Sequence, residues 1–485
     1  MTDLNEGGGA PIPLCVDLDG TLVRTDMLHE TVLLLAKSSP FSLIALPGWL
    51  RHGKAGLKQR ITERVSIDAA NLPYRPDVLA LIEAARAQRR PIVLATASCA
   101  GVANVITNHL GLFDEVLCSD GGTNLSADTK ARALVERFGE RGFDYIGNDK
   151  ADLPVFARAR RAFLVSSRDG LRQAARDRNH DIGFIDDPGG GLRVWAKALR
   201  IHQWLKNFLI FIPLLAAHQL TNLSLLLWAA LAFLSFSLCA SSVYLLNDLL
   251  DLPADRKHRR KKNRPFASGA LPVKSGVAAI PLLLGASLVL ALQLPPRFLV
   301  VLGLYYFLTI AYSFLLKKQV IVDVMLLASL YSIRVIAGSA ATDIKPSFWL
   351  LAFSIFVFLG LALVKRYSEL REATLAAKTL PGRGYRPEDL PVVLALGSSS
   401  GMISVLILAM YTQAEIVPAM YPSPEWLWLA PTLMLYWTAR LWMKTVRGEV
   451  DEDPVLFAAR DWQSLVVVAL MACTFLLAMS GLSLW

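Results

Sequence analysis

The chain has 485 residues, of which 54% are hydrophobic and 19% charged, and it carries a formal net charge of +10. This length allows two domains, and the composition argues against an entirely soluble enzyme. The cations lie largely in short loops between apolar stretches, which indicates a membrane protein and argues against a nucleic-acid binder. Five cysteines without a CxxC pair indicate reduced, buried thiols and exclude a disulfide framework.

The first part of the chain mixes charged and apolar residues as globular domains do. Its opening stretch, "MTDLNEGGGAPIPL", has neither a basic start nor a long apolar region, so we expect no secretory signal and a cytosolic domain.

Three apolar stretches in this domain end in polar residues. "PLCVDLDGTLV", "RPIVLATAS" and "FDYIGNDKADLP" each read as a buried strand followed by a turn, and helical stretches lie between them. Alternating strands and helices predict a parallel sheet, whose strand ends form a ligand crevice. The polar residues delivered there are Asp17, Asp19, Thr96, Asn148, Asp149 and Asp152.

The D-x-D-G-T strand end, the later threonine, Lys130 and the acidic segment together resemble the haloacid-dehalogenase phosphatase superfamily, over about residues 12–170. The resemblance implies a Rossmann-like α/β fold with a small helical cap over about residues 26–90. It also implies that Asp17 takes the phosphoryl group as nucleophile and that Asp19 protonates the leaving oxygen and then activates water.

The same resemblance implies that Thr96 and Lys130 bind phosphoryl oxygens. It implies Mg²⁺ as cofactor, with the ligands Asp17, Asp19, Asn148, Asp149 and Asp152. Asn148 departs from the family pattern, which has Asp after the glycine, so we expect weaker metal binding unless a neighbouring aspartate compensates. The alternative is a phosphatase-like scaffold that binds a phosphate or a partner without turnover.

A composition shift occurs at "DDPGGG", residues 186–191, which we interpret as a linker. It separates a predicted domain at 1–190 from one at 191–485. The second domain holds about nine apolar stretches of membrane-spanning length, which predict an all-α polytopic membrane domain. Their predicted centres lie near residues 212, 235, 283, 307, 330, 357, 401, 434 and 474.

The loops between these stretches differ in charge. "DRKHRRKKNR", "LKKQ", "VKRYSELREATLAAKTLPGRGYR" and "MKTVRGEVDEDP" alternate with short or weakly charged loops. By the positive-inside rule the basic set is cytosolic, which predicts a multi-pass protein of the cell (inner) membrane with a cytoplasmic N-terminal domain.

Three carboxylates lie at the end of one apolar stretch, directly before the densest run of Lys and Arg. Asp248, Asp251 and Asp255 are spaced by three and four residues, with Asn247 four before Asp251, so we expect one helical stripe. Pro253 predicts a bent or unwound last turn. Convergent carboxylates repel one another unless a divalent cation lies among them, which predicts a Mg²⁺ and pyrophosphate site. The alternative is a solvated loop whose basic part contacts anionic lipid.

The next basic loop carries "AYSFLLKKQVIVDVMLLASLYSIRVIAGSAA". Asp323 and Arg334 are eleven residues apart, so we expect them on one helix face, with Arg334 deeper in the bilayer. A charge at that depth indicates a functional site, and the alternative is a structural Asp–Arg or Arg–carbonyl pair.

The motif "NDLLDLPAD" followed by "NRPFASG" resembles the first aspartate motif of the UbiA superfamily of membrane prenyltransferases, and "YSFLLKK" before Asp323 resembles the second. "LRIHQWLKNFLIFIPLL" is similar to the start of its polyprenyl-phosphate phosphoribosyltransferase branch, although Ile201 and His202 depart from it. Leu327 stands where many aromatic prenyltransferases carry a further Asp, which argues against an aromatic acceptor.

This resemblance implies Mg²⁺-dependent transfer involving a polyprenyl lipid and a pyrophosphate-containing co-substrate, with phosphoribosyl pyrophosphate as the expected donor. The metal ligands would be Asp248, Asp251 and Asp255. The expected substrate-binding residues are Lys206, Asn247, Arg264, Tyr312, Lys317, Asp323 and Arg334. The alternative role for Lys206 is that of an ordinary membrane-interface anchor that does not bind phosphate.

Three functions are therefore open. The first is a bifunctional enzyme whose cytosolic half removes a phosphate from the lipid product or a related metabolite. The second is an aromatic or quinone-pathway prenyltransferase with an unrelated or inactive phosphatase-like domain. The third is a membrane-anchored sensor or scaffold with relic motifs.

Overall fold

The computed structural model describes residues 11–51, 53–120, 124–187, 189–375, 384–450 and 453–482. The chain forms two units that are described separately below. Unit 1 comprises Met1–Arg200 and Tyr244–Pro281, and unit 2 comprises Ile201–Val243 and Leu282–Trp485. The segment that carries the aspartate motif thus belongs to the same unit as the N-terminal domain.

Unit 1 is built on a parallel six-stranded sheet with the strand order β3-β2-β1-β4-β5-β6. The strands are β1 Leu14–Val16, β2 Ile92–Cys99, β3 Glu115–Ser119, β4 Asp144–Gly147, β5 Ala162–Val165 and β6 Ile182–Ile185. All pairings are parallel, which confirms the fold class expected from the alternating strands and helices.

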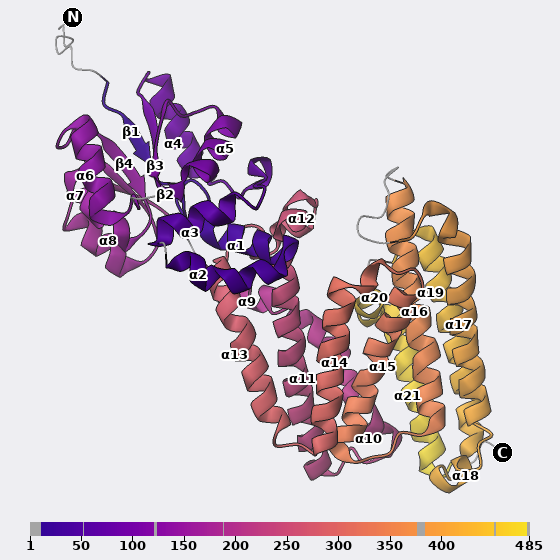
Figure 1. Cartoon of the computed structure of the whole chain (residues 1–485). Coiled ribbons are helices and arrows are strands. Elements are labelled where there is room, and N and C mark those ends of the chain that lie inside the picture. The colour runs from indigo at the N-terminus through magenta and orange to yellow at the C-terminus, as the bar shows by residue number, and fades with distance from the viewer. Residues whose placement is uncertain are drawn as a thin grey trace, which may run out of the picture. The chain divides into compact units, whose positions relative to one another are not determined.

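Helices cover both faces of this sheet (Figure 1), with α4 and α5 on one face and α6, α7 and α8 on the other. They are α4 Pro76–Ala87, α5 Ala100–Leu110, α6 Ala127–Phe138, α7 Leu153–Arg158 and α8 Asp169–Arg176. Alternate side chains of one strand supply the two cores: Leu14 and Val16 join one cluster, and Cys15 joins the other. β1 is buried throughout, as a central strand of a doubly covered sheet must be.

Short helices follow β1 within the predicted cap region. They are α1 Met27–Ser38, the 3₁₀ helix η1 Pro40–Ala45, α2 Leu46–Leu50 and α3 Gly53–Thr62. Asp26 starts α1 by accepting hydrogen bonds from the backbone N–H groups of Leu28 and His29. The later helix α9, Leu192–Ala198, follows the predicted linker.

The aspartate motif breaks a helix. α11 spans Leu223–Leu250, and after Asp251 the chain starts a new helix, α12, Leu252–Lys257. Pro253 lies in the first turn of α12, where its missing N–H costs no helical bond. The predicted unwinding before Pro253 is therefore confirmed.

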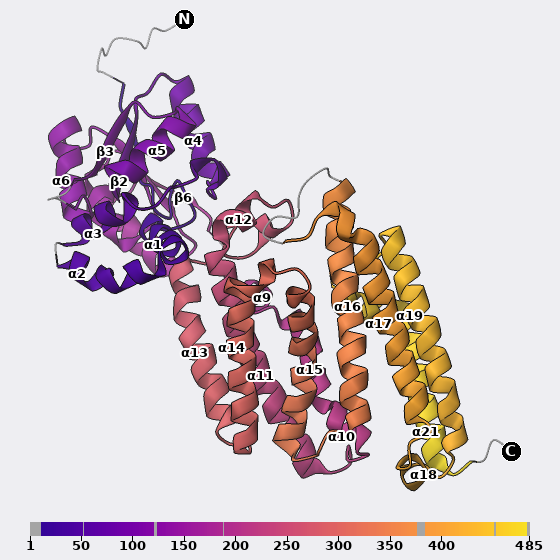
Figure 2. The ribbon, with the colours of Figure 1, turned by 45° about the vertical axis from the view of Figure 1, so that its right-hand side comes forward.

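Unit 2 is helical, and its long helices run side by side in Figure 2. The remaining helices are α10 Ile212–Ala216, α13 Val273–Ala291, α14 Pro296–Phe314, α15 Val322–Thr342, α16 Phe348–Leu375, α17 Leu390–Tyr411, α18 Val417–Met420, α19 Leu429–Arg447, α20 Pro454–Arg460 and α21 Trp462–Ser480. Gly397 of α17 allows close packing, since a Cβ there would lie 2.3 Å from the Trp442 ring of α19.

Among the described residues, seven helices are long and apolar enough to cross a membrane. They are α11, α13, α14, α15, α16, α21 and the stretch Pro387–Tyr411 that contains α17. Each of the nine centres expected from the sequence falls within a helix; the two outside these seven lie in the short α10 and in α19. Cys15, Cys99 and Cys239 are buried as expected, whereas Cys473 is exposed.

Candidate active sites

The first site lies where β1 ends, between its neighbours β2 and β4. Asp17 follows Val16 directly and is buried. Its Oδ1 accepts a hydrogen bond from Lys130 Nζ at 2.7 Å, while the Thr21 hydroxyl donates to Oδ2 at 3.4 Å. Lys130 is itself buried on α6, so the sheet and a helix bring nucleophile candidate and cation together as expected.

Charge and burial oppose each other at this pair. Burial, Asp152 and Asp19 raise the pKa of Asp17 and Lys130 lowers it, and the net effect is a rise to about 7. Burial lowers the pKa of Lys130, but Asp17 and Asp152 outweigh this and raise it. Lys130 therefore stays cationic at neutral pH and can stabilise negative charge on Asp17 and on a phosphoryl group held beside it.

Asp19 is fixed by two donors. The backbone N–H of Met27, the first residue of α1, donates to its Oδ1 at 2.7 Å, and the Ser98 hydroxyl donates to Oδ2 at 2.8 Å. Burial raises the pKa of Asp19, and these hydrogen bonds lower it in part. A raised pKa suits a carboxyl group that has to deliver a proton to a leaving oxygen.

The remaining phosphatase candidates lie on β2 and after β4. Thr96 is fully buried, and its Oγ1 accepts from the backbone N–H of Ser98 at 3.0 Å. Asn148 lies against the loop after β1: a Cβ on Gly20, whose φ is +76°, would lie 2.0 Å from Asn148 Nδ2. Asn148 thus faces the D-x-D loop with an amide, the group expected to contribute a neutral metal ligand.

The two later aspartates differ in role. Asp152 is buried and accepts hydrogen bonds from the backbone N–H groups of Asn148 and Asp149 and from the Tyr145 hydroxyl. It therefore shapes the turn and completes the charge pair with Lys130, 3.5 Å away. Asp149 is exposed and caps the next short helix through Lys150 N–H.

The second site is the aspartate motif, also in unit 1. Asp248 and Asp255 are buried, and Arg264 Nη1 reaches both, at 3.0 Å and 2.7 Å. Arg200 donates to the same oxygen of Asp248. Burial raises the pKa of Asp255, Arg264 lowers it, and Asp248 adds to the rise.

The third carboxylate points elsewhere. Asp251, in the break between α11 and α12, accepts from Lys37 Nζ of α1 at 3.0 Å. Asn247 accepts the Asp251 N–H through its backbone oxygen at 2.9 Å. Two of the three expected carboxylates therefore converge on one arginine, and the helix break turns Asp251 toward a lysine.

No group of three or more His, Cys, Asp or Glu side chains within the described ranges is close enough to hold a metal ion. Arg264 lies between Asp248 and Asp255, and Lys130 contacts Asp17. The oxygen donors are nevertheless of the kind that Mg²⁺ prefers, and a metal that keeps several waters and shares substrate oxygens needs only one or two carboxylates. The donor set therefore fits Mg²⁺ at both sites.

Unit 2 holds the third constellation, around the Q-W-x-K-N stretch. Lys206 pairs with Asp453, and the Lys206 Nζ lies 5.6 Å from the centre of the Tyr331 ring. The neighbouring Asn207 is buried, and its Oδ1 accepts from Arg334 Nε at 2.8 Å. The Lys-Asn pair thus reaches two different polar partners.

Arg334 is buried and surrounded by aromatic rings. Its guanidinium lies 5.3 Å, 5.2 Å and 5.6 Å from the ring centres of Phe236, Tyr305 and Tyr331. Asp323 contacts residues outside α15. It is fully buried beside Arg366, 2.6 Å away, and accepts from the Tyr385 hydroxyl at 2.7 Å. This arrangement favours the structural alternative for Asp323. Tyr312 in α14 and Lys317 in the 3₁₀ helix Leu316–Lys318 are half-buried.

Sequence reasoning missed several partners of the expected residues. They are Ser98, Tyr145, Arg200, Arg366 and Asp453. Ser98 follows Thr96 by two residues, so strand alternation gave a usable signal. Tyr145 lies on β4, seven residues before its partner Asp152, whereas Arg200, Arg366 and Asp453 come from elements distant in sequence, where spacing gives no signal.

Comparison with known proteins finds a family match for each of the two parts of the chain. Residues 208–465 match the UbiA prenyltransferase family. The chain belongs to the UbiA prenyltransferase family. Residues 14–157 match the haloacid dehalogenase-like hydrolases, so this family member carries an additional N-terminal hydrolase-like domain.

An uncharacterized protein, y4nM, of Sinorhizobium fredii is 36% identical over 472 residues, 96% of this chain and 91% of that protein. The decaprenyl-phosphate phosphoribosyltransferase of Mycolicibacterium smegmatis is 39% identical over 272 residues, 55% of this chain and 86% of that enzyme. A solved UbiA homolog from Archaeoglobus fulgidus, bound to DMAPP and Mg²⁺, is 16% identical and covers 58% of this chain and 98% of that chain with a TM-score of 0.43.

Proposed function

We propose that the chain is a bifunctional membrane enzyme that transfers phosphoribose from phosphoribosyl pyrophosphate to a polyprenyl phosphate and then removes a phosphate. The observation that carries the proposal is the 39% identity with the decaprenyl-phosphate phosphoribosyltransferase over 86% of that enzyme. The buried cluster of Asp248, Asp255 and Arg264 supports it, since it combines metal-binding carboxylates with a phosphate-binding guanidinium.

In the transfer step, an oxygen of the lipid phosphate forms a bond to C1 of the ribose as the bond from C1 to the pyrophosphate oxygen breaks. The nucleophile is already an anion, so no protein base is required. Asp248 and Asp255 would hold Mg²⁺, which would supply positive charge to neutralise the departing pyrophosphate, and Asp251 remains a proposed further ligand. Arg264 and Arg200 lie at these carboxylates and would bind the remaining phosphate oxygens. Lys206, Lys317 and Arg334 remain proposed phosphate contacts.

In the hydrolytic step, Asp17 would attack phosphorus while Asp19 protonates the leaving oxygen, and Asp19 would then activate the water that releases inorganic phosphate. Lys130, 2.7 Å from Asp17, keeps positive charge beside the phosphoryl group. Mg²⁺ would be held by Asp17 with Asn148.

The proposed location is the cell (inner) membrane with the N-terminal domain in the cytosol. The basic loops support this orientation, since Arg256, Lys257 and their neighbours directly follow the end of α11.

A donor test separates the two transferase alternatives. Full-length protein in detergent with Mg²⁺ receives either ribose-labelled phosphoribosyl pyrophosphate and polyprenyl phosphate, or polyprenyl pyrophosphate and an aromatic acid. We expect label from the sugar donor in the lipid phase, and its loss in Asp248→Asn. The matched control is Asp343→Asn, which changes an exposed carboxylate paired with Arg297. Transfer to the aromatic acid alone would contradict the proposal.

A further inference from the structure

The cap of unit 1 exposes an apolar segment between α1 and α3. This cap insertion comprises η1 and α2, residues 40–50. Phe41 is 86% exposed, Ile44 80% and Leu50 51%. Soluble domains rarely leave such side chains clustered in water without a function for them.

The helix before the insertion ends at the boundary of a candidate membrane span. Leu33 and Leu34 of α1 line one narrow crevice with Leu249, Leu250 and Leu252, all in unit 1. Lys37, at the end of α1, contacts Asp251, the first residue beyond the span that closes at Leu250. Pro40 follows Lys37 by three residues, a reach of at most about 11 Å. The insertion therefore begins a short distance along the chain from a residue that contacts the end of candidate span α11.

Charge in this region suits an anionic lipid surface. The sequence from residue 31 to 62 contains five Lys and Arg residues and no Asp or Glu. Arg51 and Lys54 directly after the insertion are exposed, and Arg64 stacks over Trp49, 4.8 Å from the ring centre. Exposed apolar side chains with an interfacial Trp and flanking cations are typical of segments that lie in a membrane interface.

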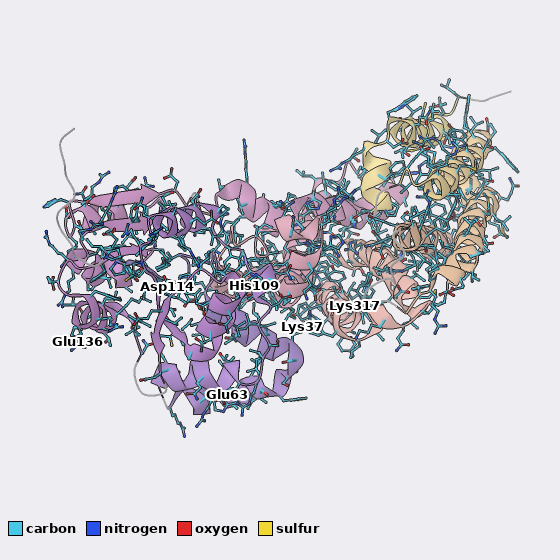
Figure 3. The ribbon with its side chains drawn as sticks, turned by 90° about the horizontal axis from the view of Figure 1, so that it is seen from above. Lys37, Glu63, His109, Asp114, Glu136 and Lys317 are labelled. Atoms are coloured by element: carbon cyan, nitrogen blue, oxygen red, sulfur yellow. The ribbon has the colours of Figure 1, made fainter. Side chains whose placement is uncertain are left out.

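The two helices that flank the insertion, α1 and α3, both contact residues at or next to the phosphatase site. Helix α1 before it donates its first N–H, from Met27, to Asp19. Helix α3 after it places Lys58 Nζ 2.6 Å from the carbonyl of Ala97, next to Thr96, and the Thr62 hydroxyl 3.2 Å from Cys99. Figure 3 labels Lys37 and Glu63, which bracket this stretch. The insertion is thus connected to residues of the phosphatase site through α1 on one side and through α3 on the other.

We infer that the cap insertion lies in the lipid headgroup layer and that the phosphatase site acts on a phosphate borne by a membrane lipid. The occupant of the apolar face is the bilayer itself. The substrate part of this inference rests on the proposed phosphatase function, whereas the lipid contact does not.

The lipid contact is tested on the full-length chain in nanodiscs that contain phosphatidylglycerol and a diazirine-bearing phospholipid. After illumination, we expect lipid adducts on the peptide covering residues 38–51 and on span α17, which serves as the positive control. The negative control is the peptide around Val105 of α5, whose side chain is 42% exposed. The double variant Phe41→Ser/Ile44→Ser should lower the adduct yield on its own peptide about tenfold. Adducts on α17 without adducts on 38–51, or crosslinks between two copies of 38–51 in their place, would overturn the inference.

The substrate class is tested with the same variant and two probes, p-nitrophenyl phosphate in solution and polyprenyl-phosphoryl 5-phosphoribose in the nanodisc. We expect kcat/KM for the lipid probe to fall about tenfold while that for the soluble probe changes less than about twofold. Val105→Ser should alter neither. An equal effect on the two probes would overturn the lipid-substrate class. If wild type and Asp17→Asn are equally inactive on both probes, the proposed phosphatase function fails, and the adduct experiment still decides the lipid contact.

Discussion

Glu30 of α1 and Arg256 of α12 form a buried, two-pronged ion pair. Arg256 Nη2 lies 2.6 Å from Glu30 Oε1 and Nη1 lies 3.2 Å from Oε2. The Thr25 hydroxyl also donates to Glu30 Oε1, and Arg256 Nε donates to the carbonyl of Ala267. This pair fixes the helix that leaves the phosphatase loop to the segment that carries the aspartate motif.

Breaking that pair should destabilise unit 1. Glu30→Gln leaves Arg256 buried without its carboxylate, which costs about 3–5 kcal/mol in typical buried pairs. We expect a lower unfolding temperature and faster hydrogen exchange over residues 252–269. Lys257→Gln is the control, because its pair with Asp68 is exposed and such pairs contribute about 0–1 kcal/mol. Equal shifts in the two variants would refute a stabilising role for Glu30.

Asn148 should limit metal affinity at the phosphatase site. Asn148→Asp adds a negative charge beside the D-x-D loop, so half-maximal hydrolysis of p-nitrophenyl phosphate should need several-fold less Mg²⁺. Asp149→Asn, which changes an exposed capping residue, is expected to shift this concentration much less. An unchanged Mg²⁺ requirement in Asn148→Asp would show that Asn148 is not a metal ligand.

The ion pair between Lys206 and Asp453 allows two roles of Lys206, phosphate binding and a purely structural contact, to be distinguished. Burial raises the pKa of Asp453, but Lys206 outweighs this and the pKa is lowered, so Asp453 is ionised at neutral pH. If Lys206 binds phosphate, Lys206→Gln should raise KM for phosphoribosyl pyrophosphate about tenfold or more, whereas Asp453→Asn keeps the cation and should raise it far less. Equal rises in KM would mean that the pair only holds structure.

Asp144 should make the stability of unit 1 depend on pH. Burial raises its pKa, but Arg160 and Arg90 outweigh this and lower it below 3.8. A carboxylate with a lowered folded pKa stabilises the fold above its unfolded pKa, and this contribution is lost as pH falls through the folded pKa. The difference in unfolding temperature between wild type and Asp144→Asn should therefore be large at neutral pH and shrink below about pH 4. A difference that is constant with pH would contradict this assignment.

The sequence predicted those features that depend on local pattern. The ends of the predicted strands located Asp17 and Asn148. The helix break before Pro253 was predictable because proline has no backbone N–H to donate within a helix. Spacing alone put Asp251 on the stripe of Asp248, but the helix break turns it toward Lys37, 214 residues earlier in the chain. Periodicity carries no information on partners that far apart.

The same limit applies inside the membrane domain. Asp323 and Arg334 share a helix, yet each pairs with another element, Arg366 of α16 and Asn207 of the Q-W-x-K-N stretch. Helix geometry states which face a residue occupies, while the packing of neighbouring helices decides what it meets.

The most direct test of the two-step account uses phosphoribosyl pyrophosphate labelled with ¹⁴C in the ribose and ³²P in the 5-phosphate. With polyprenyl phosphate and Mg²⁺, wild type should move ¹⁴C into the lipid and release ³²P as inorganic phosphate. Asp17→Asn should keep both labels in the lipid, and Asp248→Asn should transfer neither. An identical ³²P to ¹⁴C ratio in the lipid from wild type and Asp17→Asn, or no ¹⁴C in the lipid at all, would contradict the account.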